Sequence, residues 1–139
     1  MIILDTNVIS ALMRQEFEPR VLAWSDSLPS ETIWTTAVTV FEIRFGLEVM
    51  AGGRRRARLE EAFTGVLEED LEGRVLPLDS AAADIGGKVA AKRRRAGHPL
   101  DFRDIQIAGI ALSRKATLAT RNIRHFQDTG LTLVDPWAA

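Results

Sequence analysis

Apolar and polar residues alternate along the chain in blocks of two kinds. The short blocks are apolar or β-branched, are bounded by charged or turn residues, and predict strands: Met1–Leu4, Ile33–Thr35, Arg74–Leu78, Thr117–Ala119 and Thr132–Val134. The longer blocks predict helices: Asn7–Met13, Pro19–Ser27, Val40–Met50, Arg54–Asp70, Ser80–Ala96 and Phe102–Lys115. Because strands alternate with helices, the sequence predicts an α/β fold built on a layered sheet.

The last of these predicted helices contains the string IQIAGIAL, from Ile105 to Leu112, which is apolar on almost every side. We therefore expect it to be buried between the sheet and other helices. Crossovers between parallel strands are right-handed, so the carboxyl ends of the strands share one edge of the sheet. Ligands of open α/β sheets bind at that edge, and functional residues are expected there.

Composition narrows the class of protein. The chain has 139 residues, of which 46% are hydrophobic and 27% charged, and this excludes a collagen-like or wholly disordered protein. We expect one domain over residues 1–139. The chain has no cysteine, which excludes disulfides and thiolate chemistry and favours a cytoplasmic protein. No apolar stretch approaches the roughly 18 residues that span a bilayer, so we expect no membrane segment.

Charge is balanced in total but clustered along the chain. The formal net charge of -1 argues against a histone-like coat for DNA. Basic residues nevertheless concentrate in two runs, at residues 54–58 and 92–95. Such a run is either a solvated helix face or a surface that follows a nucleic-acid backbone. The sequence leaves both interpretations open.

Three acidic residues stand at chemically interesting positions. Asp5 ends the first predicted strand in ILDTN, Glu42 stands in TVFE, and Asp104 stands in DFRD. Each also has a purely structural interpretation. Asp5 would cap the following helix, and Glu42 would complete a capping box with Thr39. Asp104 would complement a helix dipole next to a capping Asp101.

Taken together, these acids favour a bound cation. Glu42 and Asp104 are embedded in the apolar strings VFEI and FRDIQIAGIAL, where an unpaired charge is costly. Arg44 and Arg103 are adjacent candidates for pairing, but neither is placed to neutralise all three acids. A hard divalent cation would satisfy several carboxylates at once, and Mg²⁺ or Mn²⁺ prefers oxygen ligands. The sequence therefore favours a metal over buried ion pairs.

Four strings in order, ILDTNVIS, TVFEIRFG, HPLDFRDIQIAGIAL and LATRNIRHF, resemble the PIN-domain family. The similarity covers nearly the whole chain and is strongest to the VapC-like and FitB-like toxins of bacterial type II toxin-antitoxin operons. It implies a three-layer α/β/α domain with a mainly parallel sheet of four to five short strands. It also implies a Mg²⁺- or Mn²⁺-dependent endoribonuclease that hydrolyses RNA phosphodiester bonds.

The resemblance assigns roles to individual residues. Asp5, Glu42 and Asp104 match the metal-binding acids, and these three with Asn122 match the catalytic set. Asn122 stands in TRNIRHF, where many members of the family have an aspartate. An amide oxygen is a neutral ligand, so Asn122 would hold a second metal weakly or orient a metal-bound water. Asp101, three residues before Asp104, could supply the missing charge.

Neighbouring polar residues have two interpretations each. Four polar residues beside the acids either contact phosphate or sugar, or serve in capping and turns. They are Thr6, Asn7, Thr120 and Arg121. Two isolated histidines, His98 and His125, are more typical of hydrogen-bonding residues than of catalytic bases, and a metal-activated water would make a histidine base unnecessary.

The resemblance also implies partners. A cognate antitoxin would insert a side chain, often arginine, into the acidic site, because a guanidinium binds carboxylates in bidentate fashion. RNA would be the substrate, the toxin would form a homodimer, and operator DNA would be bound only through the antitoxin. Apolar residues sufficient for an interface are Phe41, Phe45, Leu47 and Trp24.

Two alternatives remain. A phosphohydrolase similar to haloacid dehalogenases would use Asp5 as nucleophile and needs an aspartate two residues later, where this chain has Asn7. A non-catalytic module that binds nucleic acid or protein would use the acids as helix caps and the arginines as contacts. Metal binding at the acids distinguishes a catalyst from such a module.

Overall fold

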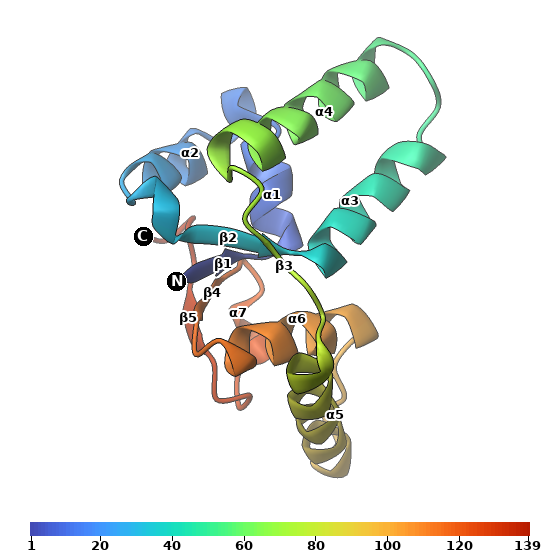
Figure 1. Cartoon of the computed structure of the whole chain (residues 1–139), viewed down its shortest axis with the longest axis vertical. Helices are drawn as coiled ribbons and strands as arrows, with labels where there is room; N and C mark the ends of the chain where they lie inside the picture. Colours follow the sequence, from blue (N-terminus) through green and yellow to red (C-terminus); the bar gives the residue numbers. More distant parts are fainter.

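A computed structural model describes residues 1–139 and contains a five-stranded, all-parallel sheet with helices on both faces (Figure 1). The strands are β1 (Ile2–Leu4), β2 (Ile33–Thr36), β3 (Val75–Leu76), β4 (Thr117–Ala119) and β5 (Thr132–Val134). Their order across the sheet is β3-β2-β1-β4-β5. The prediction of a layered α/β fold with a parallel sheet is confirmed, and the sheet has five strands.

Helices form the two outer layers. One face of the sheet is covered by α1 (Thr6–Leu12), α2 (Pro19–Asp26), α3 (Ala37–Val49) and α4 (Arg54–Gly65), and the other by α5 (Ser80–Arg95), α6 (Phe102–Ser113) and α7 (Ile123–Phe126) (Figure 1). Shorter helical turns are η1 (Gln15–Phe17), η2 (Ser30–Thr32) and the π-helical η3 (Val66–Asp70). None of the helices combines the length and the apolar character needed to cross a bilayer.

Three boundaries differ from the sequence-based expectation. The helix predicted from Val40 begins at Ala37, because the side chain of Thr36 accepts a hydrogen bond from the Thr39 N–H at 3.1 Å and caps α3 there. The helix predicted over residues 54–70 changes to π geometry after Gly65. The third strand is shorter than predicted, because β3 pairs only with the last two residues of β2.

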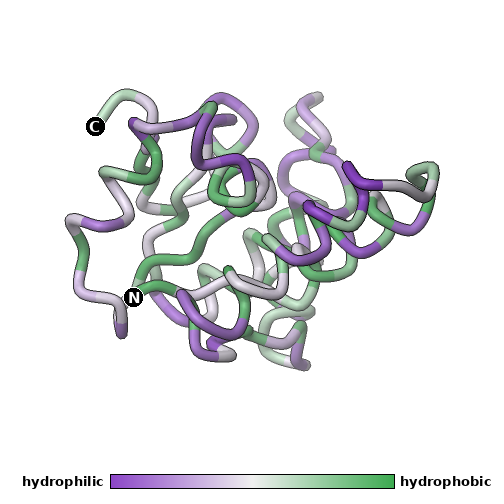
Figure 2. The backbone as a smooth tube through the Cα atoms, turned by 90° about the horizontal axis from the view of Figure 1, so that it is seen from above, coloured by the Kyte–Doolittle hydropathy of each residue, from purple (hydrophilic) through white to green (hydrophobic).

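Two hydrophobic clusters fill the spaces on either side of the sheet. Neighbouring residues of a strand point to opposite faces, so Leu4 belongs to the cluster under α1–α4 and Ile3 to the cluster under α5–α7. Figure 2 shows the apolar stretches concentrated in the strands, while the outer helices alternate in hydropathy. As predicted, α6 is buried along most of its length, including Ile107 and Ile110.

Helix α6 is held close to α5 by glycines at the contact. Gly86 of α5 and Gly109 of α6 face one another. A Cβ atom on Gly109 would lie 2.4 Å from the carbonyl oxygen of Ala82, far inside van der Waals contact. The backbones approach closely because neither residue has a side chain. This contact fixes α6, which carries Asp104, against the rest of the molecule.

We predict that Gly109→Ala lowers the free energy of unfolding by about 1–3 kcal/mol, because the added methyl group forces the two helices apart. Gly87→Ala is the matched control on α5, where an added Cβ meets no atom within 4 Å. It should raise the free energy of unfolding by about 0.5–1 kcal/mol through helix propensity. Urea denaturation measures both, and equal effects would contradict the close approach of α5 and α6.

Candidate active site at the carboxyl edge of the sheet

The order in which the chain adds strands to the sheet reverses between β1 and β4. The chain builds β1, β2 and β3 towards one edge and then adds β4 and β5 on the other side of β1. In open α/β sheets, ligands bind outside the carboxyl ends of the strands at such a point. Leu4 pairs with Ala119, so the residues that follow, Asp5 and Thr120, lie side by side. The candidate site is built around these two residues.

The carboxylate of Asp5 is buried, with 3% of the residue exposed. Its Oδ1 accepts a hydrogen bond from the Thr6 N–H at 2.8 Å, and its Oδ2 accepts one from the Thr120 hydroxyl at 2.7 Å. The Asn7 amide also donates to Oδ2, at 3.4 Å. Asp5 thus stands at the N-cap of α1, as its structural interpretation required. Burial raises the pKa of Asp5, although the bonds from Thr120 and Thr6 oppose this rise.

Glu42 reaches the same site from α3. Its Oε1 accepts a hydrogen bond from the Thr6 hydroxyl at 3.1 Å, and its Oε2 lies 3.6 Å from Nη1 of Arg103. Burial is the main cause of a raised pKa for Glu42, and the charge of Asp5 adds to it. The capping-box interpretation is wrong, because Thr39 lies inside α3 and its hydroxyl is 3.1 Å from that of Thr6.

Asp104 lies in the first turn of α6. Asp101 caps this helix, as expected, by accepting a hydrogen bond from the Arg103 N–H at 2.9 Å. The Oδ2 of Asp104 is 3.6 Å from Nδ1 of His125. Burial, followed by the charges of Asp5 and Asp101, raises the pKa of the Asp104 carboxyl to about 6, although His125 lowers it. Asp104 therefore ionises near neutral pH.

The three acids form one electrostatic cluster. The negative charge of Asp5 raises the pKa of both Glu42 and Asp104. The basic side chains nearby are weakly placed, because Arg103 and His125 are each 3.6 Å from the acid that they contact and are more than half exposed. Asp5 belongs to none of the ion pairs of the chain. An additional positive charge at this edge would therefore be favourable.

The donor set fits a hydrated divalent cation better than a closed metal cage. No three acidic or histidine side chains are close enough to one another to form a preassembled metal centre. Carboxylate oxygens are nevertheless the ligands that Mg²⁺ prefers, and Mg²⁺ typically uses one or two of them while it keeps several waters. Asp5, Glu42 and Asp104 form an open group of carboxylates with raised pKa values, which suits a Mg²⁺ ion that keeps several of its waters.

Asn122 lies at the same edge but does not contact the acids through its side chain. Its N–H donates to the Thr120 hydroxyl at 3.0 Å, and the same hydroxyl donates to Asp5. The Asn122 side chain is exposed and makes no hydrogen bond within the chain. The flanking residues Thr6 and Thr120, by contrast, bond directly to the acids. His125, which sequence reasoning placed among ordinary hydrogen-bonding residues, lies against Asp104.

Two further expectations are corrected. Of the candidate ion-pair partners, Arg103 contacts Glu42, but Arg44 lies 3.8 Å from Glu48 and from Glu60 instead. Of the apolar residues expected at an interface, Leu47 is buried and Trp24 packs against the core. Both point inward because the apolar face of their helix faces the sheet. Phe41 and Phe45 are exposed, as expected, at 68% and 59%.

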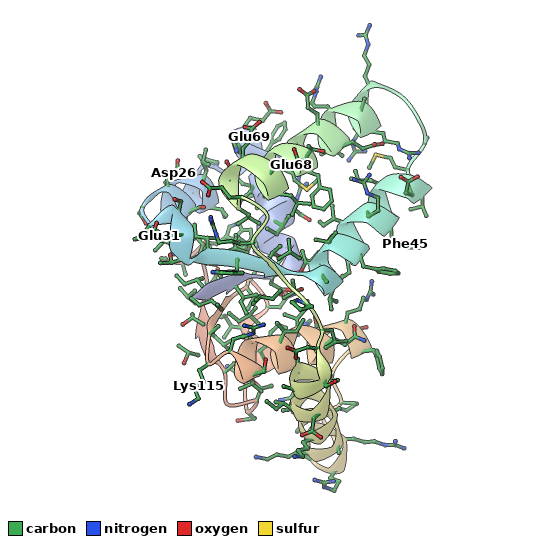
Figure 3. All side chains as sticks on the ribbon, in the orientation of Figure 1. Asp26, Glu31, Phe45, Glu68, Glu69 and Lys115 are labelled. Carbon is green, nitrogen blue, oxygen red and sulfur yellow. The ribbon has the colours of Figure 1, made fainter.

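A second acidic group lies away from this site. Asp26, Glu31, Glu68 and Glu69 gather around the amino end of β2 (Figure 3). Of these, Asp26 and Glu69 line a hollow of about 490 Å³, together with Asp70 and apolar residues that include Leu12 and Leu71. Burial and the charges of Glu69 and Asp26 raise the pKa of Asp70 there. Because the acids of the candidate site stand at the carboxyl edge, the two groups are separate.

The fold and the site define a class of protein: an α/β domain with an acidic cluster at the switch point of a parallel sheet. The sequence model of the PIN domain matches residues 2–130, and the chain belongs to the PIN-domain family. It is 39% identical to "VapC ribonuclease Y4jK" of Sinorhizobium fredii over 137 residues, 99% of this chain and 98% of that protein. It is 34% identical to "Toxin FitB" of Neisseria gonorrhoeae, with 99% of each chain covered.

Solved structures agree with these relatives. A structure of FitAB bound to an IR36 DNA fragment superimposes with a TM-score of 0.88 at 34% identity, over 99% of this chain and 96% of that chain. A structure of VapBC-1 from nontypeable Haemophilus influenzae gives a TM-score of 0.77 at 30% identity, with both chains covered completely. The expected family, its VapC and FitB branch of toxins and the expected ribonuclease class are thereby confirmed, and a haloacid-dehalogenase fold is not supported.

The raised pKa values predict a pH-dependent stability in a chelator. Between about pH 4 and pH 6 the folded chain keeps the Asp104 proton that the unfolded chain has lost, so the free energy of unfolding falls as the pH rises through this window. Raised pKa values for Asp5 and Glu42 act in the same direction. Thermal denaturation in EDTA should show a smaller decrease for Asp104→Asn than for the wild type. Identical pH profiles would contradict the clustering of the acids.

Proposed function

We propose that this chain, as one domain over residues 1–139, is the metal-dependent ribonuclease toxin of a type II toxin-antitoxin module and acts in the cytoplasm. The observation that carries the proposal is the cluster of Asp5, Glu42 and Asp104, whose pKa values are all raised and whose charges are balanced only in part, by Arg103 beside Glu42 and His125 beside Asp104. Full-length relatives that are ribonucleases support the same activity. The cofactor would be Mg²⁺ or Mn²⁺.

Each residue has a role in this mechanism. Asp5 and Asp104 would hold the principal cation, and Glu42 would hold or orient its waters. When bound, the cation would favour deprotonation of a water and stabilise negative charge on the leaving oxygen. The Thr6 and Thr120 hydroxyls fix the rotamers of Glu42 and Asp5 by donating to their carboxylates. These bonds keep the acids positioned before substrate arrives.

The site assignment includes Asn122 as a fourth polar residue. Its amide oxygen would contact a second cation or the attacking water. Its backbone N–H is already tied to the Thr120 hydroxyl that supports Asp5. Since the side chain is exposed and has no partner in the chain, it is free to turn towards an occupant of the site.

The partner of this toxin would be a small cognate antitoxin. The relative FitB is named a toxin, and the similar solved structures are named FitAB, which is bound to a DNA fragment, and VapBC-1. A guanidinium of the antitoxin would enter the acidic cluster, bind carboxylates in bidentate fashion and displace the cation. Operator DNA would be contacted by the antitoxin rather than by this chain.

A homodimer is also part of the proposal. Phe41, Phe45 and Val49 lie four residues apart on α3, and all three are exposed. Residues at this spacing share one helix face, and Figure 3 shows Phe45 projecting outward from the body. Phe102, at the start of α6, is 77% exposed. A second copy of the chain would cover this apolar face.

Asp5→Asn tests the activity. We expect it to reduce RNA cleavage by roughly 10²–10³-fold or more, since a charged cation ligand is lost. The fold should persist, because an asparagine can still accept from the Thr6 N–H. Asp84→Asn, in an exposed ion pair with Lys88, is the control and should cleave like the wild type. Gel analysis of structured RNAs with Mg²⁺, Mn²⁺ or EDTA provides the measurement. Cleavage at the parental rate by Asp5→Asn would reject the site assignment.

Phe45→Asp tests the dimer. A charge on the α3 face should convert the dimer into a monomer, because an unpaired carboxylate is costly to bury. Phe17→Asp changes a phenylalanine on η1 that is more exposed than Phe45, at 74% against 59%, and should leave the dimer intact. Light scattering coupled to size exclusion measures the mass of each. A monomeric wild type, or a dimeric Phe45→Asp variant, would refute the α3 interface.

A further inference from the structure

A polar hollow opens beside Asp104, between the end of α5 and α7. It has a volume of about 280 Å³, and only one of its eight lining residues is hydrophobic. The wall contains Arg93, His98, Arg124 and His125 together with two carboxylates, Asp101 and Asp104. Asp101 lies 3.6 Å from Arg103 and Asp104 lies 3.6 Å from His125, so the two arginines of the wall are the groups left to bind an anion. The position of the hollow matters because it adjoins an acid of the proposed catalytic cluster.

Arg93 is positioned in this wall without being neutralised. Its Nε donates to the carbonyl oxygen of His98 at 2.9 Å, and its Nη1 donates to the carbonyl oxygen of Gln127. Both acceptors are uncharged, and Arg93 forms no ion pair. The guanidinium is therefore held in position before any ligand binds, and no acidic side chain of the chain balances its charge. A fixed guanidinium is well suited to bind an oxyanion.

Arg124 is also without a partner. It makes neither a hydrogen bond through its side chain nor an ion pair, and it is exposed. With His125 it separates the first hollow from a second one of about 350 Å³, which is lined by Arg121 and Asn122. Positive side chains thus continue along α7 past the end of the acidic cluster.

A nuclease with an acidic centre faces an electrostatic difficulty that these arginines would solve. A bound cation would offset the charge of the phosphate that is cleaved, but the carboxylates would still repel the neighbouring phosphates of the strand. The hollow lies within one nucleotide of Asp104, because Asp104 is itself part of its lining. Two uncompensated guanidinium groups at this distance would offset the repulsion and hold the strand in register.

We propose that Arg93 and Arg124 form a phosphate subsite for the nucleotide next to the cleaved bond. The proposal rests on the ribonuclease function proposed above, because the RNA strand is what places a phosphate in the hollow. It also gives one of the two basic runs of the sequence a role. Within residues 92–95, Arg93 turns into the subsite, whereas Arg56 of the other run is paired with Glu48 and Glu60.

Arg124→Gln is the test, because the Arg124 side chain forms no hydrogen bond or ion pair in the chain whose loss would disturb folding. Lys115→Gln is the control: Lys115 is exposed, has no ion pair, and follows the end of α6 remote from Asp104 (Figure 3). Both changes remove one positive charge. Binding of a short fluorescein-labelled single-stranded RNA is measured by fluorescence anisotropy in EDTA over a series of salt concentrations, so that no cleavage occurs.

We expect Arg124→Gln to weaken binding roughly tenfold, the effect of losing one charge-assisted hydrogen bond. The slope of log affinity against log salt should shrink by about 0.7, as for one phosphate contact fewer on a single strand. Lys115→Gln should change neither quantity, and Arg124→Lys should restore the slope. In cleavage assays with Mg²⁺, Arg124→Gln should raise KM about tenfold and leave kcat unchanged.

The outcomes separate this proposal from the proposed function. Equal affinity and equal salt slope for the wild type and Arg124→Gln would overturn the subsite, while cleavage by the wild type would still support the nuclease. Weaker binding by Arg124→Gln in a protein that cleaves no RNA would support the subsite and refute the nuclease. A reduced kcat with unchanged KM would overturn the subsite, because it would place Arg124 at the reacting atoms.

Discussion

Repulsion among three buried or half-buried carboxylates is the constraint on which this molecule depends. Asp5, Glu42 and Asp104 come from the end of β1, from α3 and from α6, and the charge of Asp5 raises the pKa of the other two. The chain opposes this repulsion only in part, through two threonine hydroxyls, the Arg103 guanidinium beside Glu42 and the His125 imidazole beside Asp104. A cation bound among these acids, as proposed above, would relieve the repulsion.

The architecture holds the acids together in spite of this cost. Parallel pairing of β1 with β4 places Asp5 beside Thr120, and the close contact of Gly86 with Gly109 fixes the helix that carries Asp104. Hydrophobic clusters on both faces of the sheet stabilise these positions. Beyond the acids, the surface charge becomes positive, because Arg93 and Arg124 lie beside Asp104 and form no ion pair. In the proposed function, the acidic centre would act on the phosphate that is cleaved, and the arginines beside it would bind neighbouring phosphates of the same strand.

Much of this could be predicted from sequence, because the decisive signals are local. Asp5 follows a short apolar strand, which predicts its place at the carboxyl edge, and Asp101 caps the apolar helix that carries Asp104, as expected. That Asp104 lies at the same edge was an expectation from the family resemblance alone. The partners of individual side chains could be predicted less well, because they depend on tertiary contacts. The sequence predicted a cap at Thr39, but Thr36 caps α3, because β2 extends to Thr36 and the helix begins at Ala37. The local sequence does not show that Leu47 points inward while Phe45, two residues earlier, points outward. The angle of α3 to the sheet decides which helix face is buried.

Calorimetric titration of Mn²⁺ into the purified chain at neutral pH tests the central claim most directly. Asp104→Asn removes one acid of the cluster, and Asp70→Asn removes an exposed acid of the separate group near β2. The wild type and Asp70→Asn should bind Mn²⁺ with the same affinity, and Asp104→Asn should bind at least about tenfold more weakly. Absence of binding to the wild type, or equal affinity for all three proteins, would contradict a cation site at the carboxyl edge.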